Sequence, residues 1–308
     1  MSSIHGVLVV DKPPAMTSHD VVAAVRRAVG GRSGPKVGHT GTLDPDATGV
    51  LVICLGKATR LVPYLQASAK TYAARMRLGQ TTTTLDASGE LVESRDASAI
   101  DEPQICEALK SFLGEIEQIP PMVSAVKVGG ERLYAKARRG EEIERAARRV
   151  SIHELVLEDF EPGERAEAGF LVTCSPGTYV RTLAADIGER LGVGAHIIEL
   201  RRLASGRFSL EQAVDLATIA ELAAQGRLAD AVLSPGEAVA DYPSVVVSDA
   251  DARQLSHGRP LSATGVDGPV AALDSQGTLL AMLEDRDGAA RPLAVLSPPA
   301  SPAKPADG

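Results

Sequence analysis

The residues most able to do chemistry lie in a glycine-rich stretch, residues 38–60, which reads GHTGTLDPDATGVLVICLGKATR. One carboxylate, Asp44, lies between Leu43 and Pro45 in this stretch. Glycines on both sides allow the backbone to approach a ligand closely. A carboxylate in such a loop can act as a covalent nucleophile or as an electrostatic partner. An aspartate before a proline is also a common turn residue, and on residue types alone that is the simpler interpretation.

Two other chemistries fit this stretch poorly. Residues 49–58 approach the pattern of a phosphate-binding P-loop, but Leu51 replaces its first glycine and Ala58 its Ser or Thr. Asp44 and Asp46 resemble the paired carboxylates of a glycosidase, but nothing in a proline-containing loop fixes their separation.

The surrounding sequence predicts the elements that hold this loop. Residues 7–10 read as a buried strand, and Thr17 or Ser18 can cap a helix that runs to residue 29. Residues 34–49 form a loop, followed by a short apolar run at 50–55. The pattern predicts further strands at 71–78, 150–160 and 169–174, and helices at 105–113, 183–191 and 210–225. Strands and helices without strict alternation indicate the α+β class.

The chain changes character after Pro235. Short predicted strands at 244–247, 269–273 and 278–283 are separated by Gly, Asp and Pro. We therefore expect a large domain at 1–235, a small β-rich domain at 240–297, and a disordered Pro- and Ala-rich tail at 298–308.

The composition disfavours membrane-spanning, secreted and zinc-binding proteins. The 308 residues are 44% hydrophobic, yet no apolar run is long enough to span a membrane and no leader peptide is evident. Cys54, Cys106 and Cys174 are far apart and odd in number, which disfavours disulfides and a zinc site. We expect a cytoplasmic protein with no membrane partner.

Charge is distributed unevenly along the chain. The net charge is −8, and residues 209–308 alone hold 6 Lys+Arg and 14 Asp+Glu. Basic residues cluster at 21–43 and 56–84, which contain no acid, and at 127–149. Such local patches suit phosphate contacts even in an acidic protein, although a solvated surface is the simpler interpretation of any single patch.

The glycine-rich stretch resembles the signature Gly-His-x-Gly-x-Leu-Asp-Pro-x-Ala-x-Gly-x-Leu of the TruB family of pseudouridine synthases. The resemblance covers roughly residues 4–208 and includes further family motifs at 6–13, 17–18, 70–72, 77–80, 118–127, 133–138, 174–183, 194–196 and 200–202. It implies the pseudouridine synthase fold, with a mixed, largely antiparallel sheet flanked by helices. It also implies a thumb-like RNA-binding segment at 120–149 and a PUA-like domain at 240–297.

The family's reaction breaks the N1–C1′ bond of uridine and joins C1′ to C5 of the same uracil. No redox change occurs, so the resemblance implies no cofactor and no metal. The expected substrate is uridine-55 in the T-loop of tRNA, which must be flipped out of the folded loop. The resemblance further implies a monomer that binds the tRNA T-arm without a guide RNA.

Carried over residue by residue, the resemblance makes Asp44 the nucleophile and Arg181 its partner, whose charge would lower the pKa of the carboxyl. Attack on C1′, attack on C6 and assistance of a glycal route are all open to Asp44. Tyr72 corresponds to the tyrosine that stacks on the uracil and can accept a proton late in the reaction. The resemblance implies five further substrate contacts. His39 would enter the T-loop of the RNA near the place that the flipped base leaves. Tyr179 and Leu200 would line the pocket, and Lys12 and Asp86 would lie at its rim. Core packing is the alternative for the tyrosines and for Leu200.

The sequence departs from the family pattern at Ala15, where a glycine is usual, and at residues 81–84, which lack an acid common before Asp86. The acidic C-terminal domain is also unusual for an RNA-binding module. Two rival functions are a non-catalytic tRNA-binding protein or RNA chaperone, and a dyskerin-like enzyme that uses a guide RNA. The retained Asp44, Tyr72, Tyr179 and Arg181 disfavour the first rival, and the thumb-like segment disfavours the second.

Overall fold

The computed structural model describes residues 4–122, 127–128, 131–132 and 145–296. The predicted tail at 298–308 and most of the thumb-like segment at 120–149 lie outside the described residues.

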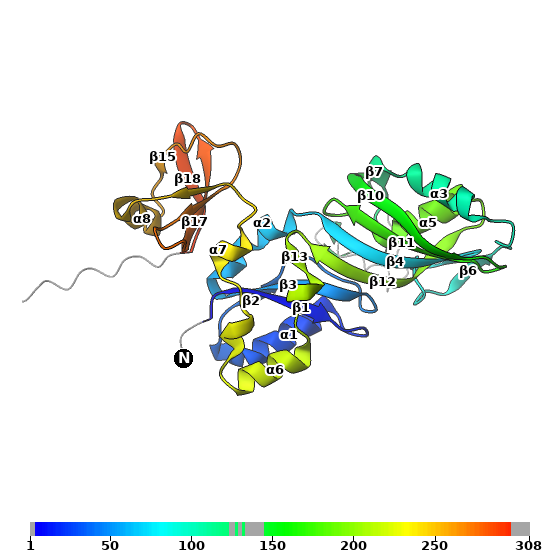
Figure 1. Ribbon diagram of the computed structural model, residues 1–308, viewed down its shortest axis with the longest axis horizontal. Coiled ribbons are helices and arrows are strands. Elements are labelled where there is room, and N and C mark those ends of the chain that lie inside the picture. The colour runs from blue at the N-terminus through cyan, green and yellow to red at the C-terminus, as the bar shows by residue number, and fades with distance from the viewer. Residues whose placement is uncertain (1–3, 123–126, 129–130, 133–144, 297–308) are drawn as a thin grey trace, which may run out of the picture.

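A nine-stranded sheet forms the centre of the larger domain, with the order β1-β3-β12-β4-β11-β10-β7 and with β2 and β13 paired to β3 and β12 (Figure 1). The strands are β1 (Gly6–Lys12), β2 (Val37–His39), β3 (Thr48–Leu55), β4 (Lys70–Leu78), β7 (Gly114–Gln118), β10 (Arg148–Glu161), β11 (Glu167–Cys174), β12 (Ala195–Ser205) and β13 (Phe208–Ser209). Only β12 and β3 pair in parallel within this sheet. The expected α+β class with a mixed, largely antiparallel sheet is confirmed.

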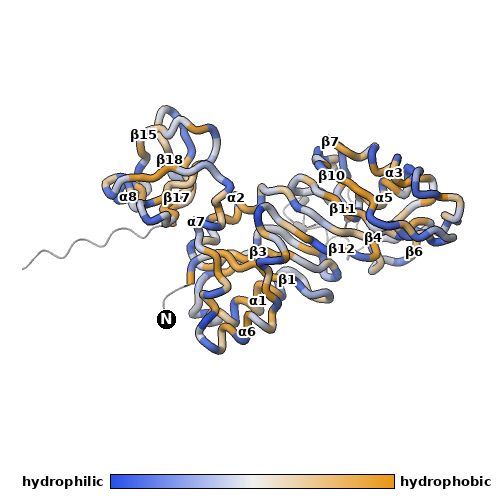
Figure 2. The backbone as a smooth tube through the Cα atoms, in the orientation of Figure 1, coloured by the Kyte–Doolittle hydropathy of each residue, from blue (hydrophilic) through white to orange (hydrophobic). Residues whose placement is uncertain are grey.

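Strands β1 and β3 are buried on both faces, which explains why their sequences are almost continuously apolar. Along β1, Val7 and Val9 contribute to one hydrophobic cluster, while Leu8 and Val10 contribute to another on the opposite face. Figure 2 shows these strands among the hydrophobic stretches of the chain. The loop before β3 is thereby attached to a strand that is buried on both faces.

Helix α1 (Ser18–Ala28) begins as the sequence predicts. Thr17 accepts a hydrogen bond from the backbone N–H of Asp20, whose side chain caps Thr17 in return. Helix α6 (Leu216–Ala224) contributes to the same hydrophobic cluster as α1. Helices α3 (Glu102–Lys110) and α5 (Val180–Arg190) pack on the strands at the other end of the sheet.

Three predicted helices have different bounds, and the one predicted at 183–191 is α5, which begins earlier, at Val180. The predicted helix at 210–225 is a 3-10 turn (Leu210–Gln212) followed by α6, because Asp215 caps a new helix start. The predicted helix at 105–113 begins earlier, at Glu102, because Asp101 and Gln104 form a capping box. Short helical segments complete this domain: Gly31–Ser33, Gly56–Leu61, α2 (Val62–Gln66), Leu228–Ala231 and α7 (Pro235–Ala238).

Several strands lack a clear signal in the sequence. The most important is β12, which lies between β3 and β4 although no strand is predicted there. Its polar residues Glu199, Arg201 and Arg202 obscure the alternation that marks a strand. The sequence also gives no prediction of β7, or of the separate hairpin of β5 (Gln80–Thr82) and β6 (Leu91–Ser94). A two-stranded pair, β8 (Lys127–Val128) and β9 (Glu131–Arg132), lies in the thumb-like segment.

The C-terminal module contains a second sheet of five strands in the order β14-β16-β17-β18-β15. Its elements are β14 (Ser244–Val246), α8 (Asp249–Ser256), β15 (Leu261–Ser262), β16 (Val270–Leu273), β17 (Leu279–Arg286) and β18 (Ala289–Val295). The sequence predicts the β-rich character, but not α8, β15 or β18. Met282 and Leu279 join the hydrophobic cluster that covers one face of β1 and β3, so the module packs directly on the larger domain.

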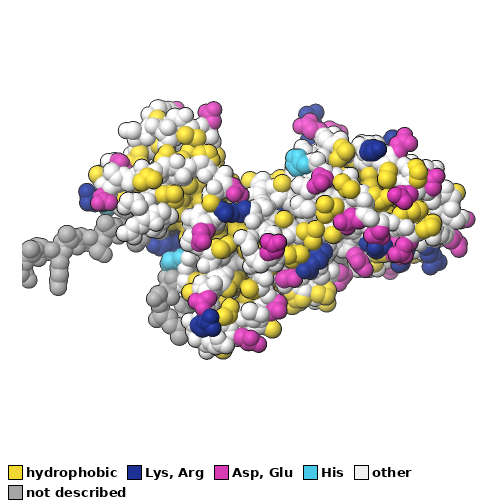
Figure 3. Space-filling model, in the orientation of Figure 1, with side chains coloured by type: hydrophobic (Ala, Val, Ile, Leu, Met, Phe, Trp, Pro, Cys, Tyr) yellow, Lys and Arg dark blue, Asp and Glu magenta, His cyan; other side chains and the backbone are white. Residues whose placement is uncertain are grey.

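On the face shown in Figure 3, Lys and Arg side chains are scattered among Asp and Glu side chains and do not merge into one basic patch. No helix of the described residues is long and apolar enough to cross a membrane.

Candidate active site

The loop that carries Asp44 connects β2 to β3 and is fastened to α1. The hydroxyl of the buried Ser18 accepts a hydrogen bond from the Leu43 N–H at 2.8 Å and lies 3.1 Å from the Leu43 carbonyl, to which it donates. At the end of the loop, Gly49 has φ +100° and lies so close to the Arg202 backbone that an added Cβ would be 2.2 Å from its carbonyl oxygen. Only glycine fits this junction.

Lys12, expected at the pocket rim, lies behind the loop and lines neither cavity. Its side chain is fully buried, and its Nζ donates to the carbonyls of Pro13, Met16 and Pro45 at 2.8, 2.6 and 2.8 Å. Desolvation lowers the pKa of Lys12 to about 8, with the charges of Asp46 and Asp44 opposing the shift. Lys12 therefore fixes the loop around Asp44 and does not reach the cavity.

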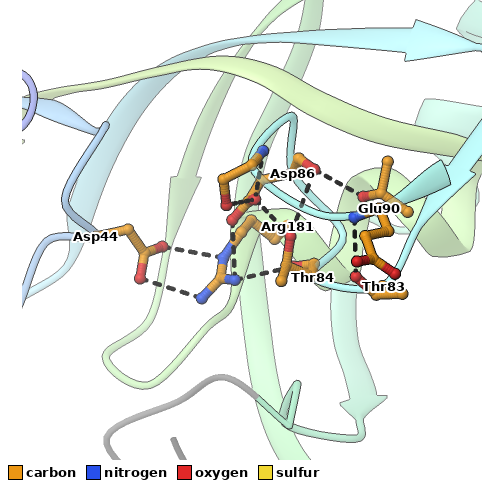
Figure 4. A network of polar contacts seen from close by, with 8 residues as sticks. Asp44, Thr83, Thr84, Asp86, Glu90 and Arg181 are labelled. Atoms are coloured by element: carbon orange, nitrogen blue, oxygen red, sulfur yellow. Dashed lines mark hydrogen bonds and ion pairs between the residues drawn. The ribbon is translucent and has the colours of Figure 1, made fainter. Parts of the chain in front are cut away.

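Arg181 lies between two carboxylates, Asp44 and Asp86 (Figure 4). Its Nε is 2.9 Å from Asp44 Oδ2, and its Nη2 donates to Asp44 Oδ1 at 3.1 Å. On the other side, Nη1 donates to Asp86 Oδ2 at 3.0 Å and to the Thr84 carbonyl at 2.9 Å. The Arg181 side chain is only 5% exposed, so the bidentate pair fixes the plane of the Asp44 carboxylate.

The pKa of Asp44 is raised, whereas the pairing with Arg181 alone would lower it. Although 40% of its side chain is open to the cavity, the surrounding protein removes much of its water, and this desolvation raises the pKa of Asp44. The charge of Arg181 opposes the shift, and the charge of Asp86 adds to it. The net direction is upward, so Arg181 limits the rise in pKa and does not reverse it.

The side chain of Asp86, expected at the pocket rim, is fixed by several hydrogen bonds. Its Oδ1 accepts hydrogen bonds from the Thr84 hydroxyl at 2.6 Å and from the Ser88 hydroxyl at 2.6 Å. The preceding Leu85 adopts a left-handed φ of 62°, and its carbonyl accepts from the Ile197 N–H. Such a conformation costs a non-glycine residue roughly 1 kcal/mol or more, which the surrounding contacts must offset.

A cavity of about 250 Å³ opens beside Asp44. Strand register sets its floor, because β12 pairs with β4 so that Arg202 is opposite Tyr72 and Leu200 is opposite Ala74. The cavity is lined by Thr40, Gly41, Thr42, Leu43, Asp44, Gln66, Lys70, Tyr72, residues 175–181, Leu200 and Arg202. A smaller cavity of about 170 Å³, which Asp86 lines, shares Asp44, Arg181 and Leu200 with the first.

Four residues that the sequence predicts for the site thus meet Asp44 at one cavity: Tyr72, Tyr179, Arg181 and Leu200. Burial raises the pKa of Tyr72, so its phenol is uncharged at neutral pH. The backbone of Tyr179 is fixed by Gln118, whose side chain accepts from the Tyr179 N–H at 3.0 Å and donates to its carbonyl.

His39 lies at the start of the loop and does not line the cavity. Its ring meets that of His19 edge to face, with centroids 6.0 Å apart, and its Nδ1 accepts from the Gly41 N–H. Ala15, in the turn between β1 and α1, has φ 57°, which explains why glycine would suit that position.

Two buried cations at the cavity are not assigned from the sequence. Lys70 and Arg202 are 7% and 2% exposed, and both line the cavity. Arg202 donates from Nε to the Val50 carbonyl at 2.7 Å and from Nη2 to the Gly41 carbonyl at 3.1 Å. Both residues lie inside family motifs, at 70–72 and 200–202. A positive charge within a motif of an RNA-binding family is the feature of the sequence that could have predicted them as site residues.

The chain matches three family models that together cover most of its length. These are the N-terminal domain of TruB family pseudouridylate synthases at residues 26–180, a tRNA pseudouridylate synthase B C-terminal domain at 181–240, and a tRNA pseudouridine synthase II C-terminal domain at 242–297.

Curated relatives and a solved structure agree with these models. Proteins named tRNA pseudouridine synthase B are 47% identical in Thermobifida fusca, over 95% of this chain and 98% of the relative, and 54% identical in Symbiobacterium thermophilum, over 83% of each. A solved H/ACA ribonucleoprotein bound to a substrate RNA containing 2′-deoxyuridine is 27% identical with a TM-score of 0.73, over 96% of this chain and 86% of that one. The chain belongs to the TruB family of pseudouridylate synthases.

Proposed function

We propose that this pseudouridine synthase isomerises uridine-55 in the T-loop of tRNA, with Asp44 as the nucleophile. The observation that carries the proposal is the bidentate pairing of Asp44 with Arg181 at the edge of the cavity. The names of the bacterial relatives support tRNA as the substrate. The cavity of about 250 Å³ is compact and suits one flipped base better than a folded RNA element.

The reaction needs an ionised carboxylate and a proton path. Arg181 opposes the desolvation that raises the pKa of Asp44, and so favours the ionised carboxylate. The N1–C1′ bond breaks, C5 bonds to C1′, and the proton on C5 must then leave while N1 gains one. Tyr72 provides a stacking surface for the uracil. Because its phenol is uncharged in the free protein, it can accept the C5 proton only as it passes its own proton on.

This proton balance provides a direct test. With tRNA labelled with tritium at C5 of uracil, each turnover releases tritium to water, and mapping of the product shows whether position 55 is the one changed. We expect Asp44→Asn to reduce the single-turnover rate by on the order of 10⁴-fold or more, as removal of a catalytic carboxylate does elsewhere.

Asp46→Asn is the matched control, because Asp46 is an exposed carboxylate in the same loop and forms no ion pair with Arg181 among the described residues. It should retain most of the wild-type rate. Retained turnover in a verified Asp44→Asn protein would remove the proposed nucleophile. Release of tritium from a position other than 55 would replace the proposed target.

The same experiment separates catalysis from a purely binding function. A non-catalytic tRNA-binding protein would bind tRNA without releasing tritium, whereas we expect Asp44→Asn to bind tRNA within several-fold of the wild type. Activity of the purified chain on tRNA without added RNA would also exclude a requirement for a guide RNA.

A further inference from the structure

The charged residues that line the cavity form two groups. One is the pair of Asp44 and Arg181, and Arg181 also pairs with Asp86 of the adjoining smaller cavity, so two carboxylates face one cation. The other is Lys70 and Arg202, which are buried and, within the described residues, form no ion pair with a carboxylate. A buried cation without a counter-ion is costly, so it is a candidate for binding an anion.

The contacts of Lys70 leave it able to bind a ligand. Its Nζ donates to the carbonyls of Gln66, at 2.6 Å, and Ser68. An ammonium group has three N–H donors, and the third has no hydrogen-bond partner among the described residues. The two carbonyls fix the amino group in place but supply no negative charge. Desolvation lowers the pKa of Lys70 to about 8, and the nearby charge of Arg202 contributes to the same shift.

The strand places Lys70 at a useful distance from the base-stacking residue. Lys70 and Tyr72 are two residues apart on β4 and therefore share one face of the sheet, roughly 6.5 Å apart along the strand. That spacing is similar to the distance between a nucleobase and the phosphate of its own nucleotide. A base stacked on Tyr72 can thus bring a flanking phosphate to Lys70 while its sugar faces Asp44.

We propose that Lys70, assisted by the neighbouring charge of Arg202, binds a backbone phosphodiester that flanks the flipped uridine. This inference rests on the proposed function and adds a phosphate subsite to it. The phosphate supplies the counter-ion that both buried cations lack. It also orients the nucleotide, since the anion is attracted to Lys70 and Arg202 and repelled by Asp44 and Asp86.

The test combines a change in the protein with a change in the RNA. T-arm stem-loop RNAs are prepared with an uncharged methylphosphonate in place of the phosphate on the 5′ side or on the 3′ side of the target uridine. Affinity and single-turnover rate are measured for wild type and Lys70→Met with each RNA. The ordinary RNA with wild-type protein reports the proposed function, independently of the modified RNAs.

We expect one of the two neutral linkages to weaken wild-type binding about tenfold or more, the range of a lost charged hydrogen bond. Lys70→Met should weaken binding of the ordinary RNA similarly, and that same linkage should then have no further effect beyond about twofold. The slope of log affinity against log salt should fall by about 0.7, the value for one phosphate of a single strand. Lys70→Arg should restore part of the affinity.

Lys110→Met is the control, because Lys110 is exposed on α3 and does not line the cavity. It should respond to the neutral linkage as the wild type does. Additive effects of Lys70→Met and both linkages would overturn the phosphate contact. Full wild-type affinity for both modified RNAs would overturn it without any mutant, so the test does not depend on how well Lys70→Met folds.

Discussion

The larger domain and the C-terminal module differ in what they bury. Among the described residues, every buried polar or charged side chain lies in the larger domain: Lys12, Ser18, Thr40, Lys70, Gln80, Thr82, Gln118, Arg181, Thr182, His196, Arg202 and Ser205. The described part of the C-terminal module buries only apolar side chains, such as Met282 and Leu283. Burying polar groups costs stability unless they are paired, so they accumulate where function requires them.

The comparison shows that most of these buried polar groups line one cavity or hold the residues that line it. Lys12 and Ser18 hold the Asp44 loop, and Gln118 holds Tyr179. Arg181 and Lys70 line the cavity itself. The C-terminal module, in contrast, is organised as an ordinary apolar core that also covers β1 and β3. Substitutions at polar positions should therefore change chemistry in the larger domain and little in the module.

The largest effect after loss of Asp44 is expected at Arg181. Arg181→Met removes the cation that most strongly opposes the raised pKa of Asp44. A higher pKa means that the carboxylate is protonated at higher pH, so the acid limb of the single-turnover rate should move upward in pH. The rate itself should fall by on the order of 10²- to 10³-fold.

Arg75→Met is the matched control for Arg181, because Arg75 also lies between two carboxylates, Asp159 and Glu161, but away from the cavity. Its rate and pH profile should match those of the wild type. Coincident pH profiles and equal rates for wild type and Arg181→Met would show that the Asp44 pairing does not matter for catalysis.

Tyr72→Phe should have the next largest effect. The ring still stacks on the base, but the hydroxyl can no longer pass a proton, so tRNA binding should persist while the single-turnover rate falls about 10²-fold. Tyr64→Phe is the control, since Tyr64 packs against Tyr242 outside the cavity. An unchanged rate for Tyr72→Phe would assign the proton transfer to another group or to water.

Asp86→Asn should give a smaller loss of rate, about tenfold, because Arg181 loses one charged partner but keeps Asp44. The charge of Asp86 raises the pKa of Asp44, so its removal should move the acid limb downward in pH. This shift is opposite in sign to that of Arg181→Met. Measuring both pH profiles under one set of conditions checks the pair, and shifts of the same sign would contradict the electrostatic account.

The smallest effect is expected in the C-terminal module. Arg253 and Arg259 are its best candidates for binding phosphate by charge, but residues 209–308 carry 14 acids against 6 bases. Replacing both arginines by alanine should leave the salt slope of tRNA affinity almost unchanged and the single-turnover rate intact. An arginine that neutralised one phosphate would contribute about 0.7 to 0.9 to that slope. A fall of that size in the salt slope for each arginine replaced would show that the acidic module does bind RNA phosphates.

The sequence alone is sufficient to predict the strands and helices that a few neighbouring residues specify. The apolar runs of β1 and β3 and the Thr17 cap of α1 are properties of a few neighbouring residues, and the sequence predicts them at nearly their observed bounds. The signature around Asp44 is equally informative, because its residue types and spacing are long enough to identify the family.

Tertiary structure decides which residues meet. The sequence does not reveal β12 because its polar residues hide its period, yet its register with β4 places Arg202 opposite Tyr72. The family resemblance implies a place at the pocket rim for Lys12, whereas the fold buries it behind the loop. The pKa of Asp44 likewise depends on desolvation by residues far apart in the chain, which outweighs the charge of Arg181. Neighbouring residues determine caps, turns and apolar runs, so the sequence predicts them. The desolvation of a carboxylate and its ion pairs in a cavity depend on distances between residues far apart in the sequence, which only the folded chain defines.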